Sequence, residues 1–242
     1  MSYLNTFMRY EIKYILDPAE RRYLEEMMKG IMCLDRYGRT TIRNIYFDTA
    51  DNRLIRTSVD GPTYKEKLRI RSYKRVSGDG DVFVELKKKY DSVVYKRRVA
   101  MKEKDAMFWL ADNGEQPGHS QIENEIAYFR AFYNDLSPKV FISYEREAFF
   151  PKDGSDIRIT LDSNIMARDH DLSLRSGVYG QNIINRDLTI LELKVTCAIP
   201  SWFIRFIRET GLQKTSFSKY GKYYMNSFKN EYDAYKGGLM YA

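Results

Sequence analysis

Three short segments alternate charged and aliphatic residues, and this alternation constrains the fold more than any other feature of the chain. The segments are Lys67–Arg71 (KLRIR), Phe83–Lys87 (FVELK) and Leu191–Val195 (LELKV). Successive side chains on a β-strand point to opposite faces, so each segment has one aliphatic face and one charged face. One such strand alone is typical of a sheet with a face in water. Because the pattern recurs along the chain, it favours a barrel with a polar lumen and a covered outer wall.

The rest of the sequence predicts about eight strands, with helices at the periphery and in one insertion. The expected strands cover residues 9–16, 43–48, 65–75, 81–89, 92–101, 139–149, 156–162 and 188–195. The expected helices cover residues 18–30, 103–112, 122–136, 201–210 and 219–235, with a short helical or turn segment at 51–56 and a loop-rich stretch at 167–187. The connections are short and contain no obvious linker. We therefore expect one α+β domain over 1–242: an eight-stranded antiparallel β-barrel with peripheral helices, a helical insertion at about 103–136 and a C-terminal helix at about 219–235.

Composition limits the classes of function that remain. Lys and Arg outnumber Asp and Glu by 40 to 33, for a net charge of +7, which favours an anionic partner without identifying it. Two cysteines and two histidines cannot supply a disulfide framework, a four-cysteine zinc site or a histidine-rich metal site. The sequence shows no signal peptide and no apolar run long enough to span a bilayer. We expect a cytoplasmic protein in a reducing environment.

The charged strand faces carry far more cations than anions. They contain Arg9, Glu11, Lys13, Lys67, Arg69, Arg71, Glu85, Lys87, Lys96, Arg98, Arg146, Arg158, Glu192 and Lys194. Cations that converge in a barrel repel one another and lose solvation, and a bound polyphosphate with a divalent ion relieves both costs. On this interpretation, removing Arg69 or Arg71 should leave stability unchanged or raise it. A solvated sheet face is the alternative, but it predicts more Ser, Thr, Asn and Gln among the charges.

Three glutamates on these faces are candidate metal ligands. Mg²⁺ and Mn²⁺ usually bind one or two carboxylates together with phosphate oxygens, and Glu11, Glu85 and Glu192 supply such carboxylates. The common nucleotide-binding signatures GxxxxGK[ST] and GxGxxG are absent. Phosphoryl transfer does not need a protein nucleophile, because a substrate oxygen attacks while cations and a metal position the groups. A lumen of this composition can therefore support that chemistry.

The sequence resembles the VTC domain, the polyphosphate polymerase member of the CYTH / triphosphate tunnel metalloenzyme superfamily. The resemblance runs from Arg9 to about Tyr224 and rests on the order of several short motifs. These are RYEIKY at 9–14, YFDT at 46–49, KLRIRSY at 67–73, FVELKKK at 83–89, YKRRVAM at 95–101, SYEREAFF at 143–150, RITLD at 158–162, LELKV at 191–195 and FSKY at 217–220. Each motif is weak alone, and their order and strand spacing make the match specific.

The resemblance implies a metal-dependent polyphosphate polymerase that uses ATP, binds Mn²⁺ or Mg²⁺ and elongates inorganic polyphosphate. Together, the polar-face pattern and the resemblance assign charge stabilisation during transfer to Arg69, Arg71, Lys87 and Arg146. Substrate binding is assigned to Lys13, Lys67, Lys96, Arg98, Arg158, Lys194 and Lys219, and metal binding to Glu192, Glu11 and Glu85. One departure is Ser216, which stands where the family often has a lysine; Lys214 is the candidate substitute.

Three other functions stay open at the level of sequence. A tripolyphosphatase or nucleoside triphosphatase would use the same tunnel with water as the nucleophile. A non-catalytic polyphosphate-binding module would need only the cations. A nucleic-acid binder would need basic residues and stacking aromatics on an open surface, and we expect no nucleic-acid partner because most tyrosines fall on apolar strand faces or helices. A membrane-protein partner and the oligomeric state also stay open.

Overall fold

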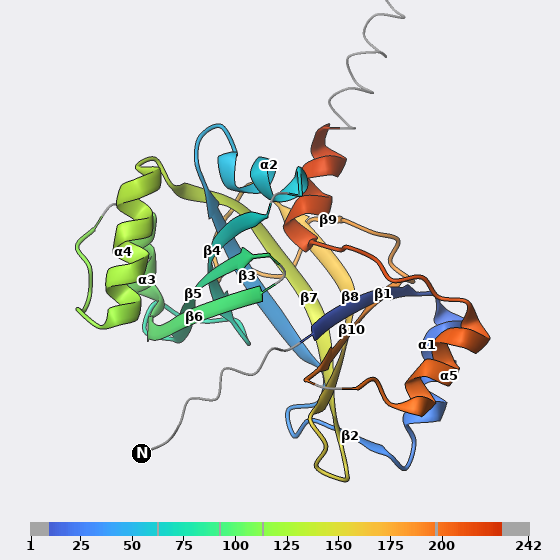
Figure 1. Ribbon diagram of the computed structural model, residues 1–242. Helices are drawn as coiled ribbons and strands as arrows, with labels where there is room; N and C mark the ends of the chain where they lie inside the picture. Colours follow the sequence, from blue (N-terminus) through green and yellow to red (C-terminus); the bar gives the residue numbers. More distant parts are fainter. Residues whose placement is uncertain (1–9, 62, 92, 113, 197, 229–242) are drawn as a thin grey trace, which may run out of the picture. The chain divides into compact units, whose positions relative to one another are not determined.

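The computed structural model describes residues 10–61, 63–91, 93–112, 114–196 and 198–228 (Figure 1). Its strands are β1 Tyr10–Leu16, β2 Met32–Leu34, β3 Thr40–Asp48, β4 Tyr64–Ser72, β5 Asp81–Tyr90, β6 Val93–Lys102, β7 Ser137–Pro151, β8 Ile157–Arg168, β9 Gln181–Asn182 and β10 Thr189–Val195. Its helices are α1 Pro18–Met28, α2 Arg53–Val59, α3 Glu103–Leu110, α4 Gln121–Tyr133 and α5 Ser201–Thr210. Residues 219–228 are also helical.

The main strands follow one hydrogen-bonded order, β1-β10-β8-β7-β3-β4-β5-β6, while β2 pairs with β7 and β9 with β8. Adjacent strands run antiparallel in β1–β10, β10–β8, β3–β4, β4–β5 and β5–β6. The fold is therefore an α+β fold built on an antiparallel sheet, as the alternating segments predict. β1 and β6 are the first and last strands of this order, and no pairing between them closes the sheet among the described residues.

The chain divides into two compact units. Unit 1 comprises the described residues of Met1–Thr41, Tyr144–Ile165 and Ile184–Phe217. Unit 2 comprises those of Ile42–Ser143, Met166–Ile183 and Ser218–Ala242. Strands β3, β7 and β8 contribute residues to both units. The single-domain assignment over 1–242 stays a prediction.

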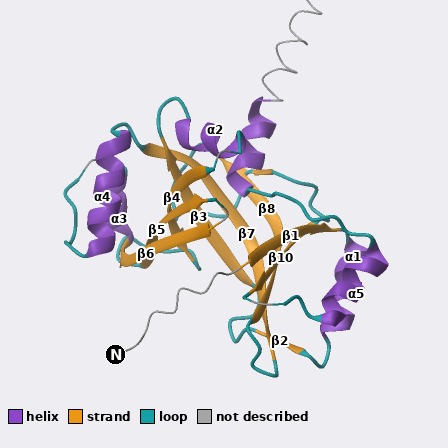
Figure 2. Ribbon diagram, in the orientation of Figure 1, coloured by secondary structure: helices purple, strands orange, loops and turns teal. Residues whose placement is uncertain are grey.

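In unit 1, helices α1 and α5 lie beside the strands, as the purple and orange ribbons of Figure 2 show. Leu16 of β1, Leu161 of β8 and Leu191 of β10 pack in one cluster with Phe203 and Phe206 of α5. Each of these side chains is at most 1% exposed. Burial of this apolar surface stabilises unit 1 and turns the other strand face, which carries the charges, away from the helices.

Helix α1 begins where the sequence predicts. The Asp17 carboxylate accepts hydrogen bonds from the backbone N–H groups of Ala19 and Glu20, at 2.7 and 2.8 Å. The Glu20 side chain in turn accepts from the Asp17 N–H, which completes a capping box with Pro18 at the first helical position. The helix ends at Met28, before Gly30 with its φ of 84°.

In unit 2, helices α3 and α4 cover the aliphatic face of β3, β4 and β5 (Figure 1). Ile45, Leu68 and Val84 on the strands pack in one cluster with Trp109 of α3 and Phe129 of α4. The helical insertion expected at 103–136 thus provides the cover for this sheet face. The opposite face of β4 and β5 carries the alternating charges.

The structure departs from the sequence-based elements in three places. Strands β2 and β9 were not expected, because three and two residues are too few to show periodicity. β8 was expected to end at Asp162 but continues to Arg168, through Asn164 in a left-handed conformation with φ of 47°. Met166 and Ala167 pair with β9 beyond this interruption. Of the expected C-terminal helix, residues 229–235 lie outside the described residues, as does Arg9 of the first strand.

Candidate functional site

Unit 2 carries a strongly basic sheet face on β4, β5 and β6, which we call the basic face. The register aligns its side chains in rows across the three strands: Lys65–Lys89, Lys67–Lys87–Lys96, Arg69–Glu85–Arg98 and Arg71–Phe83. The basic face therefore holds five lysines and three arginines but one glutamate. Sequence analysis named six of these cations and the glutamate, and it omitted Lys65 and Lys89.

Three lysines lie directly opposite one another in the second row, where Lys67 pairs with Lys87 and Lys87 with Lys96. Cβ atoms of directly opposite residues are about 4.5–5.5 Å apart, and like charges in such positions are destabilising. A bound polyanion would offset this repulsion, because phosphate oxygens would lie between the ammonium groups. This row is therefore a candidate phosphate-binding surface.

Glu85 lies at the centre of the cations on the basic face and is only 1% exposed. Its carboxylate contacts Arg69 Nη2 at 2.7 Å, Lys96 Nζ at 2.6 Å and Arg71 Nε at 3.7 Å. Burial alone would raise the pKa of Glu85, but these three cations outweigh it and lower the pKa to about 2. Glu85 is therefore an ionised counterion at neutral pH.

The two arginines of β4 are also held by neighbours on β3. Arg69 Nη1 donates to the Tyr46 hydroxyl at 2.8 Å, and Arg71 Nε donates to Asn44 Oδ1 at 2.9 Å. Each guanidinium is thus oriented by both a carboxylate and a neutral acceptor. Such fixed forks suit the bidentate binding of phosphate oxygens. Asn44 and Tyr46 carry no charge, so the charge pattern of the sequence does not reveal them.

The FSKY motif brings the start of helix 219–228 to β3 and β4 in unit 2. Lys67 Nζ donates to Ser218 Oγ at 2.7 Å. The Tyr220 hydroxyl donates to Asp48 Oδ2 at 3.1 Å, and its ring centroid lies 5.2 Å from that of Tyr46. Lys219 lies between these two anchored residues. Lys219 is therefore next in the chain to Ser218, the residue that Lys67 contacts.

Asp48 of the YFDT motif has a structural role at the beginning of α2. Its buried carboxylate accepts hydrogen bonds from the backbone N–H groups of Thr49, Leu54 and Ile55 at 2.8–2.9 Å. Burial raises the pKa of Asp48, and these hydrogen bonds counteract the rise. Burial and the Asp48 charge together raise the pKa of Tyr220.

Unit 1 carries a second charged face on β1, β10 and β8, which we call the mixed face because it holds both signs of charge. The register gives two neighbouring rows, Lys13–Glu192–Thr160 and Glu11–Lys194–Arg158. Lysine and glutamate thus alternate both along and across the strands. The structure brings together five residues that the sequence analysis selected: Glu11, Lys13, Arg158, Glu192 and Lys194.

Two lysines bridge two carboxylates on the mixed face. Lys13 Nζ lies 3.0 Å from Glu11 and 3.7 Å from Glu192, while Lys194 Nζ lies 2.7 Å from Glu192 and 3.8 Å from Glu11. Burial would raise the pKa of Glu192, but Lys194, Lys13 and Arg146 hold it well below its ordinary value. Conversely, burial would lower the pKa of Lys13, but Glu11 and Glu192 raise it. Glu192 and Lys13 are therefore both charged at neutral pH.

Arg146 is joined to the mixed face by Asp162, which sequence analysis did not select. Arg146 Nε and Nη2 donate to the two carboxylate oxygens of Asp162 at 2.6 and 2.7 Å, a bidentate pair. Asp162 is 1% exposed, so the pair fixes the guanidinium of Arg146 firmly. Arg158 lies over the Phe150 ring, with its guanidinium carbon 4.8 Å from the centroid.

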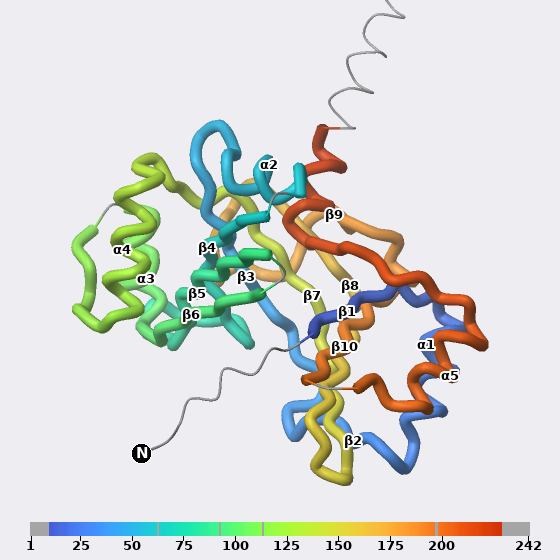
Figure 3. The backbone as a smooth tube through the Cα atoms, viewed as in Figure 1, coloured from blue at the N-terminus to red at the C-terminus, as the bar shows by residue number. Residues whose placement is uncertain are grey.

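The segment that follows α5 runs beside β1 in unit 1, as the orange-red and blue tubes of Figure 3 show. Thr215 N–H donates to the Lys13 carbonyl at 2.8 Å, and Lys13 Nζ donates to the Phe217 carbonyl at 3.1 Å. The flanking Lys214 and Ser216 are exposed. Lys13 is thus held both by carboxylates and by this segment.

Carboxylates on these faces are the candidate metal ligands. Among the described residues, no group of three or more His, Cys, Asp and Glu side chains is arranged to hold a metal ion. Glu11 and Glu192 nevertheless lie close enough to share both lysines, so they offer a pair of hard oxygen ligands. A pair is the number of carboxylates that Mg²⁺ commonly uses when phosphate oxygens supply further ligands.

The described strands thus form an antiparallel sheet with rows of arginine, lysine and glutamate on its charged faces. The family model for the VTC domain matches residues 8–228. The chain belongs to the VTC domain family. No curated protein matches the sequence.

Two solved structures share the fold at low sequence identity. The first, from Bacillus halodurans and described as a putative adenylate cyclase, has a TM-score of 0.52 and 13% identity, covering 88% of this chain and 93% of that one. The second, from Hippeastrum, is described as a putative adenylyl cyclase with a dominant triphosphatase activity. It has a TM-score of 0.51 and 16% identity, covering 90% of this chain and 96% of that one. Separately, none of the helices in the described part of the chain is long and apolar enough to cross a membrane.

Proposed function

We propose that this VTC-domain protein is a metal-dependent polyphosphate polymerase. A terminal oxygen of the polyphosphate chain attacks the γ-phosphorus of ATP. The bond from that phosphorus to the β–γ bridging oxygen breaks, and ADP leaves with that oxygen. The proposal is carried by the eight-cation basic face within a VTC domain, because linear phosphates are the ligands that best relieve its repulsion.

The basic face would bind the phosphates and stabilise charge during transfer. Arg69, Arg71 and Lys87 would stabilise the transferred group, while Lys67, Lys96, Arg98 and Lys219 would bind neighbouring phosphates. Phosphoryl transfer depends mainly on such positioning and electrostatic stabilisation. We assign Glu85 to orienting Arg69 and Arg71, whose guanidinium groups it contacts. Arg146, held by Asp162, would stabilise charge at the mixed face, where Lys13, Arg158 and Lys194 would bind phosphate.

Glu192 and Glu11 would hold Mn²⁺ or Mg²⁺. The low pKa of Glu192 keeps its carboxylate deprotonated, as a ligand must be. When bound, the ion neutralises phosphate charge as it develops in the transition state. Lys13 and Lys194 keep the two carboxylates together on adjacent strands. We also propose a cytoplasmic location, in keeping with the two-cysteine composition and with ATP as substrate.

A triphosphatase is the second candidate function. It is favoured by the fold shared with the Hippeastrum protein, whose described activity is that of a triphosphatase. The same cations would then bind triphosphate, and water would replace the chain terminus as nucleophile. A polyphosphate-binding module without turnover would need no attacking group at all.

Gel separation of the products distinguishes these functions. We would incubate the purified protein with ATP and Mn²⁺, with a Glu192→Gln variant and a protein-free sample as controls. The proposal predicts a ladder of long polyphosphate in the wild type and none in the controls. Free phosphate without a ladder would establish the triphosphatase instead. If the ATP stayed unchanged, a binding module without turnover would be the remaining candidate.

A further inference from the structure

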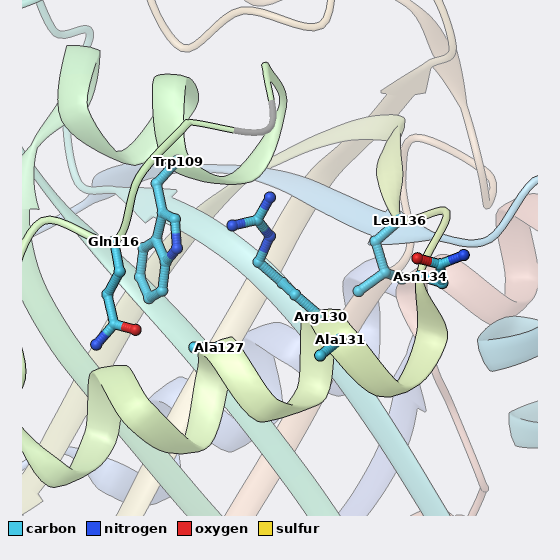
Figure 4. Close-up of a pocket in the computed structure, with 7 residues that line it drawn as sticks. All are labelled: Trp109, Gln116, Ala127, Arg130, Ala131, Asn134 and Leu136. Carbon is cyan, nitrogen blue, oxygen red and sulfur yellow. The ribbon is translucent and has the colours of Figure 1, made fainter.

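Unit 2 contains a pocket that the proposed function does not use, between α3 and α4 (Figure 4). Its volume is about 320 Å³, at the lower end of the range for small-molecule sites. Trp109 of α3, Gln116 of the connecting loop and Leu136 after α4 form part of its wall. Ala127 and Ala131, four residues apart on one face of α4, leave the space open because their side chains are small.

Arg130 supplies the one charge among the lining residues that the structure describes. Its side chain rises from α4 toward α3, and the guanidinium lies between Trp109 and Leu136 (Figure 4). Burial lowers the pKa of Arg130, so its charge is partly removed from water. A partly buried guanidinium beside apolar walls is a favourable partner for an oxyanion on an apolar body.

We propose that this pocket binds a small molecule that carries a single carboxylate or phosphate monoester on a compact apolar body. Arg130 would hold the oxyanion, while Trp109, Ala127 and Leu136 contact the apolar part. The amide of Gln116 is held by its hydrogen bond to Asn124 Oδ1 at 2.9 Å, and Asn134 also lines the pocket. The site is separate from the basic face and does not rest on the proposed polymerase activity.

The residues at the end of α4 connect this pocket to the strands of unit 2. Asn134 and Leu136 line the pocket, and Tyr133 and Asp135 alternate with them. The Tyr133 hydroxyl donates to Glu66 of β4 at 2.8 Å, and Asp135 accepts from Ala50 N–H at 2.9 Å. A ligand in the pocket would therefore lie one residue away from the hydrogen bond between Tyr133 and β4, the strand of Lys67, Arg69 and Arg71.

Trp109 makes direct measurement possible, because the chain has only one other tryptophan, Trp202 of α5. We would titrate ¹⁵N-labelled protein with benzoate, phenyl phosphate and the neutral isostere benzamide, and follow the two indole N–H signals. A Trp202→Phe variant assigns them. We expect one of the two anions to shift the Trp109 signal saturably, to leave the Trp202 signal in place, and to bind at least about tenfold more tightly than benzamide.

Two variants in the pocket test the mode of binding. Arg130→Met should weaken anion binding at least about tenfold, and Ala127→Leu should block it by filling the space while it keeps the charge. Arg205→Met, which removes an exposed arginine of α5, should bind like the wild type. Equal binding of benzamide and the anions, unchanged binding by Arg130→Met, or no shift with either anion would overturn the proposal. The wild-type comparison of anions with benzamide decides the matter even if both pocket variants fail to fold.

Discussion

Two nitrogens of Arg69, Nε and Nη2, donate to the same oxygen of Glu85, Oε2, at 2.8 and 2.7 Å. Glu85 sits directly opposite Arg69 in the register of β4 and β5, so the strand pairing itself presents the two groups to each other. Arg71 and Lys96 complete the set of cations around this buried carboxylate. The basic face is therefore organised around one negative charge, and phosphate would add the remaining compensation.

The Glu85 cluster should make stability depend on pH in the acid range. The pKa of Glu85 is about 2 in the folded protein, against an ordinary value of 4.5. Between these values the unfolded chain binds a proton that the folded protein does not. The stabilisation is thus complete above pH 4.5 and is lost as the pH falls through the folded pKa. Its size is on the order of 3 kcal/mol.

Urea unfolding of the wild type and a Glu85→Gln variant at a series of pH values checks this prediction. The wild type should be the more stable protein near neutral pH, and the difference should narrow as the pH falls from about 5 to about 3. A difference that stays constant over this range would show that Glu85 is not stabilised as an anion.

The lysine row should bind linear phosphate. We predict that Lys87→Gln weakens tripolyphosphate binding about tenfold or more, since it removes a charge-assisted contact. Without ligand, the same variant should melt at the same temperature as the wild type or higher, because it relieves like-charge repulsion with Lys67 and Lys96. Calorimetric titration and thermal melts measure the two effects.

Lys88 provides the matched control for Lys87. It is the next residue on β5, points to the opposite face and lies 3.5 Å from Glu66. Lys88→Gln changes the net charge equally but should leave tripolyphosphate affinity unchanged. If both variants lose affinity to the same extent, binding depends on net charge and not on the basic face.

Glu192 should be needed for turnover. Glu192→Gln keeps the shape of the side chain but removes a charge that Lys13 and Lys194 contact. We predict a folded protein with a lower melting temperature and a rate of ATP conversion reduced at least about a hundredfold. Circular dichroism and an ADP-release assay measure both. The control is Glu26→Gln, which removes an exposed ion pair with Lys29 on the surface of α1 and should retain full activity. If Glu192→Gln were as active as this control, Glu192 would have no part in the mechanism.

Tyr220 should contribute to stability through its hydroxyl. Tyr220→Phe removes the hydrogen bond to buried Asp48 but keeps the ring beside Tyr46. The free energy of unfolding should fall by about 1 kcal/mol, because three backbone donors still satisfy Asp48. Denaturant unfolding measures the loss, with Tyr224→Phe as the comparison. An unchanged unfolding free energy would mean that this hydrogen bond contributes nothing to holding helix 219–228.

The sequence predicts the strands well where charge and aliphatic residues alternate. β4, β5 and β10 fall where KLRIR, FVELK and LELKV place them, because one face of each must be buried. This alternation does not predict strands that are very short or interrupted. β9 has two residues, and β8 passes through Asn164 in a left-handed conformation that breaks the alternation.

Residue partnerships are harder to predict than residue faces. The parity of KLRIR predicts that Arg69 and Arg71 share a face, but only the register shows that Glu85 lies opposite Arg69. This pair changes one expectation: removing Arg69 should lower stability, because Glu85 would lose the guanidinium that donates two hydrogen bonds to it while remaining buried. Neutral partners such as Asn44 and Tyr46 cannot be identified from a pattern of charged residues. Extending the KLRIR alternation by two residues toward the N-terminus would have found Lys65.

The ratio of free phosphate to ADP produced from ATP tests the central claim most directly. A polymerase retains the transferred phosphoryl groups in the polymer, whereas a triphosphatase releases one phosphate for each ADP. We would measure both products from the wild type with ATP and Mn²⁺, with short polyphosphate as acceptor. The proposed function predicts that ADP accumulates with little free phosphate and that the acceptor lengthens. Equal amounts of ADP and free phosphate, with an acceptor of unchanged length, would contradict it.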